Sequence, residues 1–336
     1  MAVTIEDVAK HAGVSDATVS RVLSNKPHVR EEVRSRVLSS VAELGYQPSR
    51  VARSLRAQRS QTIGLIISDI QNPFFTALVR AVEDVANANE HAIFLCNTDE
   101  NIEKEKVYID LMQAEHVAGV LITPTREAGG STRKLLDANI PVVVVDRYVS
   151  DVEVDTVVVD NVRGAYSVVQ HLIDMGHRRI GAVLGFPRIT TGRERLEGYL
   201  QALSKNGIHA DPDLIQDNTP NQHWGYKLTE KLLSLPEPPS AIFTGNVLLT
   251  IGALRAIHDK GLIIPRDVAL AAYDETDWAS LVVPALTTVE QPTYELGKVA
   301  AELLLKRMQD NTRLRQKIVL QTKLHIRQSS GATLSR

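Results

Sequence analysis

The 336-residue sequence contains a single cysteine and no long apolar run. With only Cys96 present, neither an intrachain disulfide nor a Cys-x-x-Cys metal pair can form, which is typical of a protein in a reducing compartment. No run of about 18 apolar residues is present, so we expect no transmembrane helix. The segment from Met1 to Asp7 has neither the basic nor the apolar region of a secretory signal, and we therefore expect a cytoplasmic protein.

The common motifs of enzymes are also missing. There is no Gly-x-Ser-x-Gly nucleophile motif and no phosphate-binding loop. The pair Gly129-Gly130 lacks the further glycines of a dinucleotide-binding fingerprint, and we expect it in a loop. The ten histidines are scattered, and His171 and His177 do not have the i, i+4 spacing of metal ligands on a helix. We predict that the protein is not an enzyme and uses no metal or cofactor.

The charge of the chain is unevenly distributed. Residues 1–60 carry ten of the 38 Lys and Arg but six of the 40 Asp and Glu, so this segment has a net charge of +4 and the remainder −6. A basic segment on an acidic body indicates contact with a polyanion such as DNA. On charge alone, a solvated charged surface explains the pattern equally well.

Three short helices are predicted within residues 4–44. Thr4 and Ser15 are N-cap residues, and apolar residues with helical spacing follow each of them. These patterns predict helices over residues 5–12 and 16–24 with a break at Gly13, and a third helix over residues 31–44. Two short helices joined by a glycine-containing turn form a helix-turn-helix.

The second of these helices has an outer face suited to DNA. This face holds Ala17, Ser20 and Ser24, which are small enough to enter the major groove, and Arg21, which can read guanine. A generic three-helix bundle would not need such a face. Asp16 can accept a hydrogen bond from cytosine N4 or act only as an N-terminal helix charge. We predict a DNA-binding, nucleoid-associated head with contacts from Thr4, Ser15, Asp16, Ala17, Thr18, Ser20, Arg21, Asn25 and His28.

A short basic segment follows Pro48. It spans about eight residues, fewer than the ~12–15 at which an isolated helix becomes stable, so we expect it to be helical only when DNA holds it. Its basic residues would contact phosphate, and its leucine would insert into the minor groove. A plain basic linker is the alternative. The residues concerned are Arg50, Arg53, Leu55 and Arg56.

The remaining residues alternate between strand and helix patterns. Strands are predicted at 62–67, 92–96, 119–122, 141–145, 156–159, 179–184, 241–243 and 268–272, and helices at 74–88, 102–114, 194–206, 225–234 and 248–260. Nearly continuous Val and Ile runs between helices predict parallel sheets covered on both faces, in two lobes. Ligands of such sheets bind beyond the carboxyl ends of the strands.

Polar and aromatic residues stand at these strand ends. Acids, amides, arginines and the pair Phe74-Phe75 there are suited to a sugar, because aromatic faces stack on a sugar ring and polar groups bracket its hydroxyls. Asp69 and Asp160 have alternatives as helix caps or hinge residues, and Phe74 or Phe75 as a core residue.

Dense sequence motifs resemble those of the LacI/GalR (lactose and galactose repressor) family. They are residues 4–15 (TIEDVAKHAGVS), residues 17–23 (ATVSRVL), Gly45-Tyr46-x-Pro48 and residues 51–55 (VARSL), and the similarity extends over roughly residues 3–328. The resemblance implies a small all-α helix-turn-helix headpiece joined to an α/β, two-lobed, periplasmic-binding-protein-like domain with doubly wound parallel sheets.

The resemblance also implies domain boundaries. We expect a DNA-binding domain at 1–47, a hinge helix and linker at 48–60, an effector-binding and dimerisation domain at 61–328, and a disordered tail at 329–336. Within the third part, lobe one is expected at about 61–160 plus 293–318, and lobe two at about 163–290 plus 319–328.

The family's effector contacts match residues of this chain. They imply an effector site formed by Asp69, Asn72, Phe74, Phe75, Arg147, Asp160, Thr191, Arg193, Arg195, Asn246 and Asp274. Pro220 replaces an aromatic residue that relatives often have, and Trp224 is a candidate substitute. Three arginines (Arg147, Arg193 and Arg195) suggest the hypothesis of an anionic effector such as a sugar acid.

We therefore predict a homodimeric transcriptional regulator of carbohydrate metabolism, acting as a repressor on operator DNA under control of a sugar or sugar-acid effector. The C-terminal zipper that forms tetramers in one branch of the family is missing. The effector either induces or co-represses, since linkage permits both signs. A solute-binding protein would have no use for the basic head, whereas a regulator that senses a partner protein stays open.

Overall fold

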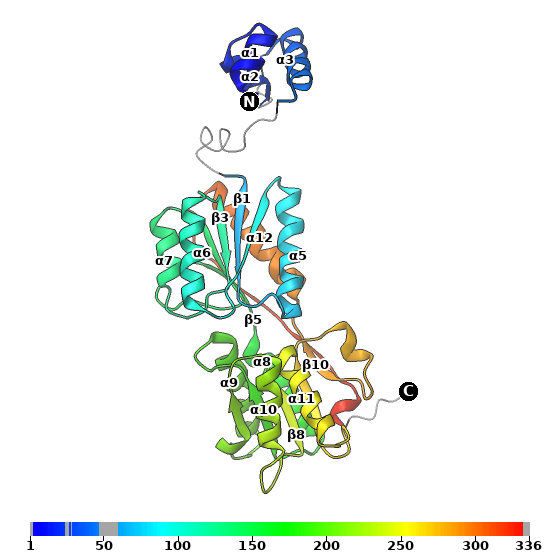
Figure 1. The fold of residues 1–336 in the computed structure, drawn as a ribbon. Helices are drawn as coiled ribbons and strands as arrows, with labels where there is room; N and C mark the ends of the chain where they lie inside the picture. The colour runs from blue at the N-terminus through cyan, green and yellow to red at the C-terminus, as the bar shows by residue number, and fades with distance from the viewer. Residues whose placement is uncertain (1–2, 24–26, 28, 47–59, 332–336) are drawn as a thin grey trace. The chain divides into compact units, whose positions relative to one another are not determined.

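The computed structural model describes residues 3–23, 27, 29–46 and 60–331. The chain divides into two units, Met1–Ser60 and Gln61–Arg336 (Figure 1). Within the described ranges, no helix combines the length and the apolar character needed to cross a membrane.

The described residues of the first unit form three helices: α1 (Ile5–Ala12), α2 (Asp16–Leu23) and α3 (Glu31–Glu43). Thr4 caps α1 in a reciprocal capping box, as its position in the sequence predicts. Gly13 has a φ of 65°, and this left-handed conformation ends α1 and turns the chain toward α2. Each helix contributes a fully buried valine (Val8, Val19 and Val37), so the three helices share one core.

Two six-stranded sheets form the second unit. Their strand orders are β11-β5-β4-β3-β1-β2 and β12-β10-β9-β8-β6-β7. Neighbouring strands are parallel, with the exception of the antiparallel pair β10–β12. The strands are β1 (Thr62–Ile67), β2 (Ala92–Asn97), β3 (Gly119–Ile122), β4 (Val142–Val145), β5 (Asp155–Val159), β6 (Ile180–Leu184), β7 (Ile215–Asp217), β8 (Ala241–Thr244), β9 (Ala269–Tyr273), β10 (Thr287–Glu290), β11 (Lys317–Leu320) and β12 (Lys323–His325).

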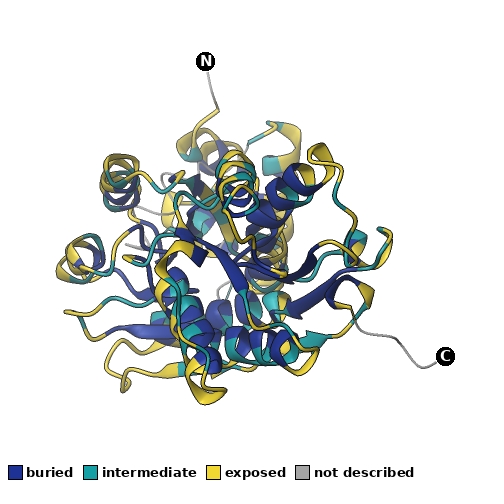
Figure 2. Ribbon diagram, turned by 90° about the horizontal axis from the view of Figure 1, so that it is seen from below, coloured by how far each residue is buried: buried dark blue, intermediate teal, exposed yellow. Residues whose placement is uncertain are grey.

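Helices cover both faces of each sheet. α5 and α12 pack on one face of the first sheet and α6 and α7 on the other, while α8 and α9 face α10 and α11 across the second sheet. The central strands of both sheets are buried, whereas the edge strands β2, β11 and β12 and the outer helix faces are partly exposed (Figure 2). The helices are α5 (Pro73–Ala88), α6 (Ile102–Ala114), α7 (Gly130–Asp137), α8 (Asn161–Asp174), α9 (Thr190–Lys205), α10 (Gln222–Leu232), α11 (Val247–Asp259) and α12 (Thr293–Gln309), with 3-10 turns at Pro212–Leu214, Asp277–Ser280 and Gln328–Ser330.

The chain crosses between the sheets three times: after β5, after β10 and after β11. We call the half built on the first sheet lobe one and the half built on the second sheet lobe two. This arrangement of a helix-turn-helix unit and two parallel α/β lobes confirms the predicted fold class.

Three sequence-based details are wrong. Gly130 begins α7 instead of lying in a loop. β11 pairs with β5 as far as Leu320, so lobe one extends two residues beyond the predicted 318. The predicted disordered tail is ordered at its start, because Ser329 and Ser330 are fully buried and the Ser329 hydroxyl accepts from Thr287 N and donates to Leu270 O.

A buried ion pair ties the end of α12 to β5, the strand next to the edge of the first sheet. Arg307 Nε donates to Asp155 Oδ2 at 2.8 Å, and their side chains are 1% and 0% exposed. The other guanidinium nitrogens of Arg307 donate to carbonyls within residues 311–314, and Gln316 N donates to Asp155 Oδ1. The pair thus holds the loop that delivers β11 to β5.

Candidate ligand cleft and nucleic-acid interface

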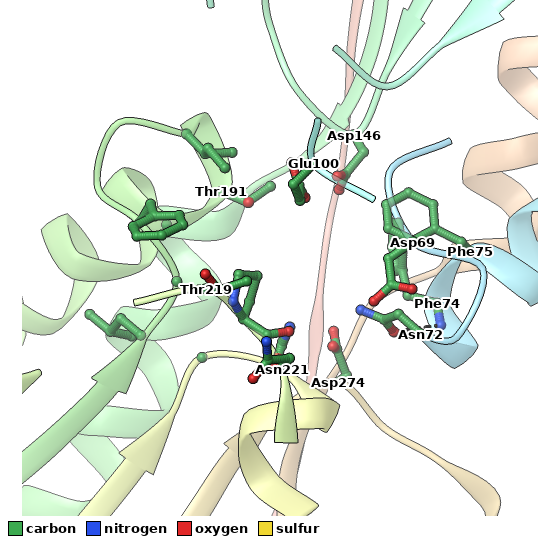
Figure 3. Close-up of a pocket in the computed structure, with 18 of the residues that line it drawn as sticks. Asp69, Asn72, Phe74, Phe75, Glu100, Asp146, Thr191, Thr219, Asn221 and Asp274 are labelled. Carbon is green, nitrogen blue, oxygen red and sulfur yellow. Dashed lines mark hydrogen bonds between the residues drawn. The ribbon is translucent and has the colours of Figure 1, made fainter. Parts of the chain in front are cut away.

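A cavity of about 260 Å³ lies between the two lobes, beyond the carboxyl ends of their strands (Figure 3). Lobe one lines it with Asp69, Gln71, Asn72, Phe74, Phe75, Asp99, Glu100, Asp146 and Arg147. Lobe two and the crossing after β10 line it with Leu184, Gly185, Phe186, Ile189, Thr191, Gly192, Arg195, Thr219, Pro220, Asn221, Gly245, Asn246, Asp274 and Gln291. The two lobes therefore supply the two walls of one cleft.

Nine of the eleven predicted effector residues line this cleft, and Asp160 and Arg193 do not. Asp160 is the N-cap of α8 and accepts a hydrogen bond from Arg163 N, so the helix-cap alternative describes it. Arg193 is half-exposed and forms an ion pair with Glu127 outside the cleft. The prediction failed at Arg193 because this residue lies on the side of α9 that faces Glu127, whereas Thr191 and Arg195 lie on the side that faces the cleft.

Four acids of the cleft have an unusual backbone. Asp99, Glu100, Asp146 and Asp274 have φ values of 50°, 58°, 70° and 76°. The other non-glycine residues with positive φ follow the last turns of α5, α6 and α7, where a left-handed residue is common. Sparsely populated backbone conformations cluster at ligand sites, because the surrounding structure must hold them there. The residues with left-handed backbones thus gather at the same cleft in which the cavity lies.

The two arginines of the cleft are already bound to protein acceptors. Arg147 donates through Nη1 and Nη2 to both carboxylate oxygens of Glu100, at 2.9 and 2.5 Å. Arg195 donates to Asn161 Oδ1 and Gly245 O, and its guanidinium lies 3.9 Å from the centre of the Tyr273 ring. Both terminal nitrogens of Arg147 are thus engaged by Glu100, whereas Arg195 uses Nε and Nη1 for uncharged acceptors.

Acids outnumber bases in the cleft lining. Asp69, Asp99, Glu100, Asp146 and Asp274 face two arginines, which gives a formal charge of −3 when all are ionised. Burial raises the pKa of Asp146 to about 6, and Arg147 and Arg195 only partly offset this effect. Burial also raises the pKa of Asp69. The three arginines therefore do not form the free cationic surface that the sugar-acid hypothesis assumes, and that hypothesis stays a prediction.

Aromatic residues line the cleft from both lobes. Phe74 and Phe75 stand edge to face with ring centres 5.0 Å apart, and both are buried at the start of α5. In lobe two the aromatic is Phe186, which sequence reasoning missed and which Arg188 covers at 4.0 Å. Trp224 does not replace the missing aromatic, because it is not among the cleft-lining residues and instead packs, half-buried, against the core beneath α10 and α11.

Asp99, Glu100, Asn221 and Gln291 are further polar lining residues that sequence reasoning missed. Asp99-Glu100 follow β2 as Asp146 follows β4, so the strand-end rule could have found them. Gln291 follows β10, a four-residue strand too short to recognise. Gln291 Nε2 donates to Asp274 Oδ1 at 2.6 Å, while the buried Gln291 Oε1 has no hydrogen-bond partner among the described residues.

Beside the cleft, side chains join the lobes directly. Thr190 accepts from Tyr148 N at 3.3 Å and donates to Glu127 Oε1 at 2.9 Å. Arg193 also binds Glu127, and the Tyr148 hydroxyl donates to Glu194. We call these five residues the interlobe latch. Since Thr191 and Arg195 face the cleft, the first turn of α9 connects the cleft with the latch.

In the first unit, α2 exposes the face that the sequence predicts. Ser15, Asp16, Ala17 and Arg21 are exposed, and Thr18 and Ser20 are half-buried. The hydroxyl of Ser15 accepts from Thr18 N at 3.3 Å, which caps α2. The exposed hydroxyl of Thr4 serves the cap of α1. Other predicted DNA contacts lie outside the described residues: Asn25, His28, Arg50, Arg53, Leu55 and Arg56.

Comparison with known protein families finds a match for each of the two units. Residues 4–49 match the family described as bacterial regulatory proteins, lacI family, and residues 169–330 match the periplasmic binding protein-like domain. The ribose operon repressor of Halalkalibacterium halodurans is 38% identical over 327 residues, which cover 97% of each chain. Catabolite control protein A of Priestia megaterium is 35% identical over 98% of this chain and 100% of its own.

Solved structures agree with these sequence matches. The lac repressor dimer bound to operator and the anti-inducer ONPF has a TM-score of 0.86 at 27% identity, over 98% of this chain and 99% of that one. The transcriptional regulator CelR in complex with cellobiose has a TM-score of 0.75 at 30% identity, over 97% and 99%.

Proposed function

Because this chain belongs to the lacI family of bacterial regulatory proteins, and is therefore a ligand-controlled transcriptional regulator and not an enzyme, we propose that it represses carbohydrate-metabolism genes in response to a neutral sugar. The observation that carries the choice of a neutral ligand is the state of the two cleft arginines. Arg147 is paired with Glu100 and Arg195 with neutral protein acceptors, whereas several carboxylates remain directed into the cleft.

The polar groups of the cleft suit a polyhydroxy ligand. Ionised carboxylates only accept hydrogen bonds, so Asp69 and Asp274, on opposite walls of the cleft, can accept hydrogen bonds from sugar hydroxyls (Figure 3). The unpartnered Gln291 Oε1 is a further acceptor, and Phe74 and Phe186 supply apolar faces. The volume of about 260 Å³ lies below the range of about 300–1,000 Å³ typical of drug-sized ligands, which favours a single sugar ring.

The DNA contacts stay predictions at the level of residues. We place Arg21 on base edges, because it is the exposed arginine of α2, and assign Ser15, Ala17 and Ser20 to the same groove-facing side. One eight-residue helix reads few base pairs, so we propose a homodimer on paired half-sites, acting in the cytoplasm at the nucleoid. The predicted hinge helix would fold on DNA and respond to the lobes.

Calorimetric titration of the full chain tests the effector proposal. D-ribose, D-glucose and D-galactose are compared with D-glucuronate, D-galacturonate and D-ribose 5-phosphate. Binding of at least one neutral sugar and of no anionic one is expected. Tight binding of only the anionic compounds would overturn the proposal. If no sugar binds while the DNA complex responds to a cell extract depleted of small molecules, a sensed partner protein becomes the better explanation.

Footprinting at varied salt tests the DNA-binding part independently. With roughly 6–10 phosphate contacts, affinity for the operator should fall by about 10³–10⁵ between about 50 and about 200 mM salt. A flat salt response would contradict an operator complex that rests on phosphate contacts.

A further inference from the structure

The wall of lobe one contains an ion pair that is nearly shielded from solvent. The side chains of Arg147 and Glu100 are 6% and 17% exposed. The contact is bidentate, and Arg147 Nη1 donates in addition to Pro124 O at 2.9 Å. Burial alone would lower the pKa of Arg147, but the charges of Glu100, Asp146 and Glu105 together more than offset this effect. The guanidinium therefore stays charged, with Nη1 and Nη2 bound to Glu100, while the buried Nε has no hydrogen-bond partner among the described residues.

The acid next to Glu100 points elsewhere. Asp99 and Glu100 are consecutive residues with left-handed backbones in the loop after β2, and both line the cleft. Asp99 is exposed and binds Lys104 and, at 2.6 Å, Asn97 Nδ2. The two adjacent carboxylates thus contribute the same formal charge, but only the carboxylate of Glu100 forms an ion pair with Arg147.

We infer that Glu100 is a specificity-determining residue, which occupies Arg147 and so makes the cleft reject anionic sugars in favour of neutral ones. The inference rests on the proposed function, in that it takes this cleft as the ligand site. An anionic ligand could use Arg147 only by displacing Glu100, which would leave a carboxylate buried without its partner. A neutral hydroxyl needs no such displacement, because it donates to acids that are already present.

Arg195 does not have the same arrangement. Its hydrogen-bond partners are the Asn161 amide and a carbonyl, both uncharged, and it lies over the Tyr273 ring. Asp146 Oδ2 approaches Arg147 Nε at 3.6 Å, beyond hydrogen-bond distance, and leaves Nη1 and Nη2 to Glu100. The discrimination against anions therefore depends on one side chain.

Matched single-charge variants test this inference. Glu100→Gln keeps the size of the side chain and removes the charge that faces Arg147. Asp99→Asn removes one charge from the neighbouring residue and tolerates the same left-handed backbone. Inorganic phosphate, D-glucuronate and D-ribose 5-phosphate serve as anionic probes in calorimetric titrations of both variants and of the unaltered chain.

Glu100→Gln should bind at least one of the anionic probes about tenfold more tightly or better, as expected for charged hydrogen bonds from a released guanidinium. Asp99→Asn should change these affinities by less than about threefold, since the charged donor that it releases, Lys104, is half-exposed and does not line the cleft. An equal gain in both variants would mean that only net charge matters, and no gain in either would mean that Arg147 cannot reach a ligand; both results overturn the inference.

The reverse variant covers the case in which Glu100→Gln does not fold. In Arg147→Gln the carboxylate of Glu100 is released instead, so the cationic probe D-glucosamine should bind about tenfold more tightly relative to D-glucose, and unchanged discrimination would overturn the inference. Phosphate binding does not depend on which sugar is the effector. If the unaltered chain binds no neutral sugar while the phosphate result holds, the proposed effector fails and the role of Glu100 stands.

Discussion

Replacing Tyr148 by Phe would remove the hydroxyl with which lobe one binds Glu194 of lobe two. The ring would stay, and with it the contact to Lys317, whose ammonium lies 4.1 Å from the ring centre. Glu194 is buried, and Asn161 Nδ2 would remain its donor at 3.1 Å. The substitution therefore tests a single bond of the interlobe latch.

The size of the effect follows from exposure. The Arg193 and Glu127 side chains are 43% and 27% exposed, so their ion pair contributes less than about 1 kcal/mol. The hydrogen bond from Tyr148 to the ionised Glu194 is better shielded from water, and bonds of this kind contribute about 1.5–3 kcal/mol. We expect the arrangement with joined lobes to lose this amount, which is a factor of about 10–150 in its equilibrium constant.

This loss should appear as weaker effector binding. A ligand held by both walls needs the joined arrangement, so its apparent affinity scales with the populated fraction of that arrangement. The dissociation constant should rise by at most the factor above, and by less if the unaltered chain is mostly joined. Titration calorimetry measures the dissociation constant, and small-angle X-ray scattering of the unliganded protein should report a larger radius of gyration.

Tyr166→Phe is the matched control for this experiment. Tyr166 lies within α8, donates to the neutral Gln170 Oε1 at 3.1 Å and has Lys205 at 4.5 Å from its ring, so its replacement also removes one hydroxyl hydrogen bond and keeps a cation–ring contact, but inside one lobe. It should leave effector affinity and scattering unchanged. Identical affinities and scattering profiles for the two variants would refute the latch.

Further outcomes follow from three other positions. Arg21→Ala should weaken operator binding by about 1–3 kcal/mol and relax sequence discrimination in a binding-site selection assay. An unchanged site preference would mean that Arg21 does not contact base edges. Burial raises the pKa of Asp146 from 3.8 to about 6, so ionising this side chain lowers the stability of the fold as pH rises through that window. Asp146→Asn should therefore raise the free energy of urea unfolding by up to about 3 kcal/mol at pH 7 and leave it nearly unchanged at pH 4. Equal effects at the two pH values would contradict the raised pKa. Arg307→Met leaves the fully buried Asp155 unpaired and should cost about 3–5 kcal/mol in guanidinium unfolding, with a smaller loss expected when Asp155→Asn is added.

Local sequence patterns were sufficient for most elements. The cap at Thr4 and the apolar spacing after it predicted α1 to the residue, because a helix start depends on a few neighbouring side chains. Continuous Val and Ile runs predicted β1 and β3 with the correct bounds. α8 was missed although its buried residues have helical spacing, and the short strands β7 and β10 were missed because three or four residues carry little periodicity.

The location of the cleft could also be deduced from the sequence. Parallel strands place their carboxyl ends at one edge, so the residues that follow predicted strands converge whatever the details of packing. Seven of the nine effector candidates that line the cleft follow predicted strands, whereas Thr191 and Arg195 lie in α9 and were implied by the family resemblance. The headpiece likewise depends on local helices and on the charge of residues 1–60, both of which are properties of the printed sequence.

Only the tertiary structure decided what the charged residues of the cleft do. Arg147 and Glu100 are 47 positions apart, and Arg193 and Glu127 are 66 apart, so no local pattern links them. Three nearby arginines suggested an anionic ligand, yet packing pairs each of them with a protein acceptor and so removes the ground for that suggestion. The sequence determined which side chains gather between the lobes, and the fold determined which charges remain there, because pairing depends on distances set by elements far apart in the chain.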